Sequence, residues 1–283
     1  MKRRTFITLL GGAAVWPLAA SAQQSLLKMP RIGIIDPAAQ WDPFRQGLSD
    51  LGYIEGRNIA IEYRSTEQTP DRLVIVTYGS PATQAAKQAT TTIPIVMVSV
   101  GDPVRAGFVA SLAQPGGNIT GNTTLGPEVA PKRLQLLKLA VPTLSRVAFL
   151  WNPDNPSLAL YLDDWKAAAP ALGVKMLFVA VRSADEFDSA FAAMMRERPD
   201  AFTMTADPLH QLHIGWIIDF LARNRLPGMY QVRENVVAGG LMSYGASFHD
   251  LYRRAAAYVH KDFARHSARR PARGAADQVR LGC

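Results

Sequence analysis

Three carboxylates stand where a short apolar run of this chain gives way to a loop. Asp36, Asp102 and Asp207 each follow a segment rich in Val, Ile, Met or Phe that is typical of a buried strand. A carboxylate at such a point can pair with the ammonium group of a small molecule. At Asp102 and Asp207 it can equally cap the helix that follows. The residues alone leave both interpretations open.

Gly79 and Ser80 follow a further apolar run, directly before Pro81 opens a predicted helix. Free backbone N–H groups at a helix start suit a carboxylate or phosphate. A plain N-cap explains Ser80 nearly as well. Asn122 is a candidate for either a hinge residue or a ligand contact.

Three tyrosines can stack on an aromatic ring or belong to the core. Tyr78, Tyr230 and Tyr244 each stand at or near the end of a predicted strand. Aromatic side chains provide large stacking surfaces, but most aromatic residues of any chain are core. Tyr230 and Tyr244 are retained as candidates beside the polar residues.

Motifs for catalysis and cofactor binding are absent from the sequence. It has no G-x-S-x-G, no Walker A loop, no H-E-x-x-H and a single cysteine, Cys283. His210 and His213 have a spacing that can ligate a metal, but no third ligand stands nearby and a solvated helix face is the simpler explanation. We therefore expect no enzyme, no cofactor and no metal.

Strands alternate with helices from about residue 29 to residue 260, which predicts parallel sheets covered on both faces. The Gly-rich segment 114–118 divides the chain into two such blocks, so we expect an α/β fold of two lobes around a cleft. Lobe 1 is predicted over 30–121 with 241–260 returning to it, and lobe 2 over 122–240. Strands are expected at 31–35, 58–63, 73–77, 93–99, 146–151, 174–181, 201–205 and 241–244, and helices at 44–51, 81–89, 128–139, 157–172, 183–196, 209–222 and from 248.

The first 22 residues have the order of a secretory signal. Basic residues 2–4 precede an apolar run over 7–20, and Ala20-Ser21-Ala22 forms an A-x-A cleavage site. A membrane span needs about 20 apolar residues, more than this run provides. We expect cleavage after Ala22 and a periplasmic protein, exported by the twin-arginine route that residues 3–6 resemble or by the general route.

The net charge of +8 is concentrated at the two ends of the chain. Residues 2–4 and 261–283 carry nearly all of it, and the body between them is close to neutral. The body of the chain between them therefore has no basic patch of the kind that binds nucleic acid.

Ordered motifs along the chain resemble one family, the ABC-transporter substrate-binding proteins of the type that takes up tryptophan and other aromatic amino acids. Residues 1 to about 259 share the resemblance. The motifs are Thr77-Tyr-Gly-Ser-Pro-Ala82, Thr91-Thr-Ile-Pro-Ile-Val96, Gly101-Asp-Pro-Val104, Ser111 to Gly121, Lys132-Arg-Leu-Gln-Leu-Leu137, Asn152-Pro-Asp-Asn-Pro156, Ala206-Asp-Pro208 and Gly239 to Gly245.

The resemblance implies a monomeric, two-lobed periplasmic binding protein similar to type I. Such a protein closes on a small amino-acid-like solute and delivers it to the permease and ATPase of an ABC importer. Because the resemblance places the Asp102 loop at the cleft, it favours ligand binding over capping there. The alternatives are a degenerate remnant that binds nothing, and an extracytoplasmic enzyme. The candidate ligand residues are Asp36, Gly79, Ser80, Asp102, Asn122, Asp207, Tyr230 and Tyr244.

The chain departs from the family in two places. Only nine residues separate Tyr63 from Leu73, whereas a crossover between parallel strands usually takes a dozen or more. Either one helix is deleted, which we favour, or the third strand pairs differently. Residues 261–283 are rich in Arg, Ala and Gly, and we expect a disordered tail. A frameshift explains this tail better than a site for nucleic acid or anionic lipid.

Overall fold

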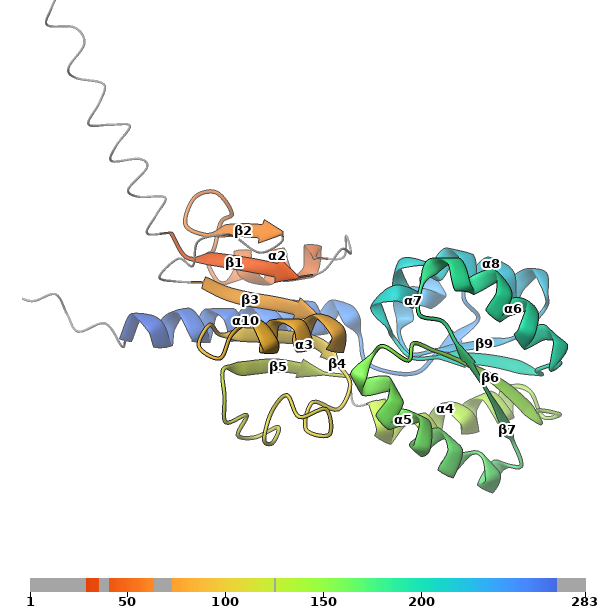
Figure 1. Ribbon diagram of the computed structural model, residues 1–283. Helices are drawn as coiled ribbons and strands as arrows, with labels where there is room; N and C mark the ends of the chain where they lie inside the picture. Colours follow the sequence, from red (N-terminus) through yellow and green to blue (C-terminus); the bar gives the residue numbers. More distant parts are fainter. Residues whose placement is uncertain (1–28, 36–40, 64–72, 125, 269–283) are drawn as a thin grey trace, which may run out of the picture.

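A computed structural model of the chain describes residues 29–35, 41–63, 73–124 and 126–268. They form two lobes, each built on one five-stranded sheet whose neighbouring strands all run parallel. Helices lie on both faces of each sheet (Figure 1). The predicted α/β architecture of two lobes is confirmed.

The sheet of lobe 1 has the strand order β2-β1-β3-β4-β5. Every residue of β4 is buried, as the Val- and Ile-rich sequence predicts for a strand covered on both faces. One face packs on α2 and α10 and the other on α3. The elements are β1 Arg31–Ile35, α2 Asp42–Asp50, β2 Ala60–Tyr63, β3 Leu73–Tyr78, α3 Gly79–Ala89, β4 Ile95–Val100, β5 Ile119–Thr123 and α10 Phe248–Ala268.

The sheet of lobe 2 has the order β10-β9-β8-β6-β7. The core on one face holds α4 and α5 with Phe149 and Trp165, and the core on the other holds α6 and α8 with Phe187 and Phe191. The elements are α4 Gly126–Ala140, β6 Arg146–Trp151, α5 Pro156–Ala168, β7 Lys175–Ala180, α6 Phe187–Arg196, β8 Ala201–Met204, α7 Pro208–Leu212, α8 Ile214–Arg223, β9 Gly228–Tyr230, α9 Arg233–Val237 and β10 Met242–Ser243, with short 3₁₀ turns at Pro170–Leu172 and Ala184–Glu186.

The chain crosses between the lobes slightly later than predicted. Strand β5 pairs with β4 of lobe 1, so the first crossing follows Thr123 rather than residue 121. Strand β10 pairs with β9 of lobe 2, so the return follows Ser243 rather than residue 240. The sequence did not indicate β5 because only Ile119 among its five residues is strongly apolar.

Some helix ends also differ from prediction. The helix expected over 209–222 is two helices, with the break at His213. Ser80 lies inside α3, whose N-cap is Tyr78, and it makes no capping bond. Strand β9 and helix α9 were not predicted because they have only three and five residues, too few to show a periodicity.

The short link of residues 64–72 joins strands on opposite sides of β1. Both β2 and β3 pair with β1 in parallel. The alternative that the third strand pairs differently is therefore wrong. The favoured interpretation, a deleted helix, falls on residues outside the described part of the chain and stays a prediction.

Helix α10 is longer than predicted and corrects the expected tail. It continues to Ala268, along lobe 1 (Figure 1). Phe263 is only 4% exposed and extends the apolar stripe of Tyr252, Ala256 and Val259 at helical spacing. Residues 261–268 are thus helical, not disordered. Residues 269–283 and the predicted signal lie outside the described residues. Among the residues that the structure describes, no helix is long and apolar enough to cross a membrane.

Candidate binding site between the lobes

The two lobes meet at the carboxyl ends of their strands, where open parallel sheets bind ligands. The start of α3 in lobe 1 touches the starts of α5 and α7 in lobe 2. The Ser80 and Ser157 hydroxyls are buried and hydrogen-bonded at 2.5 Å. Gly79 has φ +73°, and a Cβ there would lie 2.8 Å from Pro208 Cγ. The structure thus places both predicted residues of this turn at the junction.

A second contact joins the loop after β4 to α5. A Cβ on Gly101 would lie 1.9 Å from the Tyr161 hydroxyl, so only glycine fits. Arg105 donates to Asp164 and to the Leu160 carbonyl, both at 2.8 Å. These two contacts are called the interlobe contact below, formed by Gly79, Ser80, Gly101 and Arg105 of lobe 1 and Ser157, Leu160, Tyr161, Asp164 and Pro208 of lobe 2.

Asp207 is fully buried beside the interlobe contact, at the start of α7. Its carboxylate accepts from the Leu209 backbone N–H at 2.9 Å and so caps that helix. It also accepts from Asn155 Nδ2 at 2.7 Å and from Asn152 Nδ2 at 3.4 Å. No Lys or Arg in the described part of the chain forms an ion pair with it.

The Asp102 carboxylate forms hydrogen bonds within a local turn. It accepts from the backbone N–H groups of Val104 at 3.1 Å and Arg105 at 3.0 Å. The capping interpretation therefore describes its side chain, although the loop itself lies against α5. Asp36, the third predicted carboxylate, lies outside the described residues.

Two of the predicted residues brace the crossings between the lobes. Asn122 donates from Nδ2 to the Leu251 carbonyl of α10 at 2.8 Å, a bond within lobe 1, and its role as a hinge or ligand residue stays a prediction. The Tyr244 backbone N–H donates to the Tyr230 carbonyl at 3.0 Å. Its side chain is 39% exposed.

Tyr230 is corrected from a ligand candidate to a core residue. Its ring packs over Gly228 and Gly240 in the core of lobe 2, away from the carboxyl end of β9. Burial raises the pKa of its phenol. Tyr78 is likewise core, stacked on Tyr252. The sequence could not separate these rings from cleft residues because each stands at a strand end.

Arg133 is a functional candidate that sequence reasoning missed. It is fully buried in α4, where Nε donates to the Tyr244 carbonyl at 2.7 Å. Burial lowers the pKa of its guanidinium to about 10, which leaves it protonated at neutral pH. The available signal was its position between Ala130 and Leu137, on the apolar stripe of the helix.

Ser99 lies at the carboxyl end of β4. Its φ is +60°, a left-handed conformation that is costly for a residue other than glycine. Its buried hydroxyl has no hydrogen-bond partner among the described residues. Strained backbone of this kind clusters at binding and active sites.

His210 and His213 show no metal centre. His210 is fully buried against Phe187, so the expected solvated helix face is wrong for this residue, and burial lowers the pKa of its imidazole. No group of three His, Cys, Asp or Glu side chains that could hold a metal occurs among the described residues.

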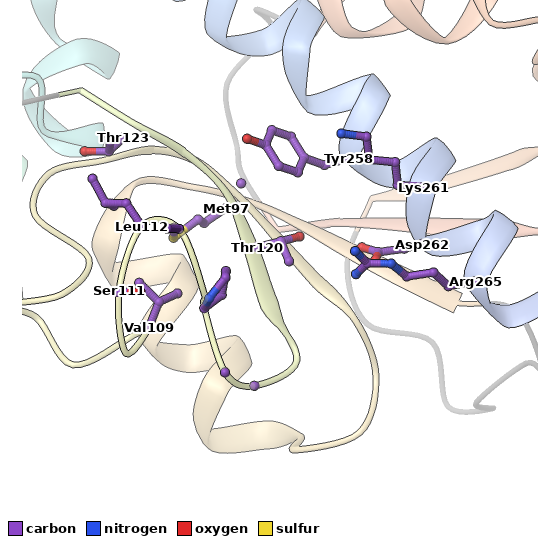
Figure 2. Close-up of a pocket in the computed structure, with 15 residues that line it drawn as sticks. Met97, Val109, Ser111, Leu112, Thr120, Thr123, Tyr258, Lys261, Asp262 and Arg265 are labelled. Carbon is purple, nitrogen blue, oxygen red and sulfur yellow. The ribbon is translucent and has the colours of Figure 1, made fainter.

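A separate pocket of about 440 Å³ lies within lobe 1 and shares no residue with the interlobe contact. Figure 2 shows it between the segment that carries Ser111 and Leu112 and the later part of α10, with Lys261 and Arg265. It is therefore not the site where the lobes meet.

Comparison with known proteins assigns the family. The family model described as "ABC transporter substrate binding protein" matches residues 38–263. The chain belongs to this family. Its members are binding proteins of ABC transporters, which agrees with a site that carries no catalytic motif.

Relatives support the same assignment. The tyrosine-binding protein of Clostridioides difficile (strain R20291) is 25% identical over 221 residues, which cover 74% of this chain and 63% of that protein. The chain thus spans less than two thirds of the length of that relative. A conserved domain protein from Vibrio cholerae superimposes with a TM-score of 0.74 at 26% identity, over 83% of this chain and 84% of the other.

A third relative shows the fold alone. The ABC domain from Streptococcus pneumoniae, solved in complex with L-Trp, has a TM-score of 0.73 at 22% identity. The superposition covers 82% of this chain and 84% of the Streptococcus chain.

Proposed function

We propose that this protein is the exported solute-binding component of an ABC importer and captures an amino-acid-like solute where its lobes meet. The observation that carries the proposal is the interlobe contact itself. Buried polar side chains from both lobes, Ser80, Ser157 and Asp207, converge at the carboxyl ends of two parallel sheets. Hinge closure of the lobes would enclose the solute there.

An aromatic or branched amino acid is the proposed solute. The relatives support this class, because one is named for tyrosine binding and another was solved with L-Trp. Asp207 is the residue we propose for the ammonium group, since it is a buried carboxylate without a Lys or Arg partner in the described part of the chain. Ser80 and the N–H groups at the start of α3 would line the opposite side.

The proposed partners are a membrane permease and its ATPase, with the binding protein acting as a monomer in the periplasm. Signal cleavage after Ala22 is part of this proposal. The mass of the protein recovered from the periplasm tests it, and a chain that begins at Gln23 is the expected result.

Thermal unfolding of residues 23–283 with and without candidate solutes tests the function. A ligand that binds only the folded state raises the midpoint by an amount set by its concentration relative to Kd. The panel is aromatic and branched amino acids, with purines as a matched unrelated class. We expect a cooperative transition raised by amino acids alone. A broad transition that no compound shifts would instead support a degenerate remnant.

A further inference from the structure

Arg133 differs from the paired arginines of the described chain because no carboxylate neutralises it. Only its Nε is hydrogen-bonded, and neither Nη1 nor Nη2 has a partner among the described residues. The arginines that form ion pairs all have side chains at least 25% exposed. They are Arg31, Arg45, Arg105, Arg223, Arg253 and Arg265.

The neighbours of Arg133 place its guanidinium beside the interlobe contact. Tyr244, whose carbonyl accepts from Nε, stands in the segment that returns the chain to lobe 1. Tyr161 is also a neighbour of the guanidinium, and its hydroxyl lies against the Gly101 backbone of lobe 1. The two unpaired Nη groups therefore lie near the junction of the lobes.

A buried cation without a counter-charge is among the costliest groups in a protein interior. Two Nη groups with free N–H donors match the two oxygens of a carboxylate, which an arginine binds in a bidentate manner. Ser99 adds a buried hydroxyl without a partner among the described residues, two positions before Gly101. An anionic oxygen pair beside the Arg133 guanidinium would satisfy Nη donors that have no partner among the described residues.

We propose that Arg133 binds the carboxylate of the solute, so that the ligands of this protein are carboxylic acids held by their acid group at the lobe junction. The inference rests on the proposed function and adds that the solute must carry a carboxylate. Amines and amides with the same side chain as such a solute should therefore bind much more weakly.

Matched compounds and matched variants test the proposal together. The compounds are L-tryptophan, L-tyrosine, L-leucine and benzoate, each beside its amide, with tryptamine and tyramine as decarboxylated forms. The variants are R133M and R133K, with K132M as control. Lys132 is the adjacent residue of α4 and is exposed, so K132M removes the same charge from the same helix.

In the wild-type protein, at least one acid should raise the unfolding midpoint and its amide should not. R133M should weaken binding of that acid by at least about 100-fold, measured by calorimetry. The affinity of K132M for that acid should stay within about twofold of the wild-type affinity. The affinity of R133K should lie between those of R133M and wild type, because an ammonium group keeps the charge but not the paired donors of a guanidinium.

The outcomes separate the inference from the function. Equal binding of an acid and its amide, or retained affinity in R133M, overturns the role of Arg133 and leaves the solute-binding function standing. Failure of every compound to bind wild type overturns the proposed function and the inference with it. If R133M does not unfold cooperatively, the acid–amide contrast on wild type decides alone.

Discussion

Selected buried polar groups in the lobe cores and near the interlobe contact differ in their hydrogen bonding. In the core of lobe 1 the Thr77 and Thr83 hydroxyls bond each other at 2.8 Å, and in lobe 2 the Thr203 hydroxyl donates to the Met229 carbonyl at 2.8 Å. Near the interlobe contact, the Ser99 hydroxyl and the Nη groups of Arg133 have no partners in the described part of the chain.

This difference indicates a division of roles. Apolar burial stabilises each lobe, and the Thr77, Thr83 and Thr203 hydroxyls within the cores are hydrogen-bonded. Unsatisfied donors at the junction lower the stability of the free protein and are available to a ligand, as is common at binding sites. Substitutions in the cores should therefore affect the free energy of unfolding, and substitutions at the junction should affect ligand affinity.

The largest effect on stability is expected from Phe149→Ala. Phe149 is fully buried and packs against Trp165 with ring centroids 4.8 Å apart. Truncation should lower the free energy of unfolding by about 4 kcal/mol, through lost burial and a residual cavity. Chemical denaturation measures the change. The control Leu139→Ala removes a side chain that is 76% exposed and should change stability by about 0.5 kcal/mol or less.

Arg133→Met should raise the free energy of unfolding, in contrast to Phe149→Ala, which should lower it. Burial lowers the pKa of the guanidinium to about 10, which corresponds to about 3 kcal/mol against the charged form in the folded state. Because the folded-state pKa is the lower one, this penalty is complete below about pH 10 and fades as the pH rises above it. The lost bond to the Tyr244 carbonyl offsets about 1 kcal/mol of the gain.

The midpoint of ligand-free R133M at pH 7 should therefore equal or exceed that of wild type. A marked destabilisation would mean that contacts within the protein offset the free-energy cost of burying the Arg133 guanidinium. Arg133 would then be a structural residue, and the contrast between core and junction would not hold at this position.

Sequence patterns predicted the fold well because burial on both faces of a parallel sheet leaves a strong signal. The run Ile95 to Val100 reads as a central strand without further information. The three-residue strand β9 carries no such signal. Gly79, Ser80 and Asp207, three of the residues predicted from their places after strands, lie at or beside the interlobe contact. Their role in ligand binding stays a prediction.

The individual roles were harder to predict because they depend on the direction in which each side chain points. Tyr230 and Tyr244 both end strands of lobe 2, but one ring turns into the core and the other is partly exposed. Arg133 stands one residue from Lys132 in a helix where charge normally indicates a solvated face. Only its place on the apolar stripe of α4 marks it as buried.

Closure of the lobes is tested by Gly101→Ala. The added Cβ would lie 1.9 Å from the Tyr161 hydroxyl, so either the Tyr161 side chain or the lobes must shift to admit it. We expect ligand affinity to fall about tenfold, the usual cost of overpacking, with each lobe still folded. Gly117→Ala is the matched control, because a Cβ there meets nothing within 4 Å. Equal affinities of the two variants would show that the Gly101 contact is not needed for binding.

The smallest effect is expected from Arg105→Ala at the exposed rim of the same contact. Arg105 pairs with Asp164 across the lobes at 2.8 Å, and both side chains are at least 30% exposed. Such pairs contribute about 0.2–1 kcal/mol, which corresponds to at most about a fivefold loss of ligand affinity. Because the pair is screened by salt, the difference from wild type should shrink as ionic strength rises. Arg223→Ala removes a pair within α8 and should leave affinity unchanged. A loss in R105A as large as that in R133M would show that the rim, and not the buried guanidinium, dominates capture of the solute.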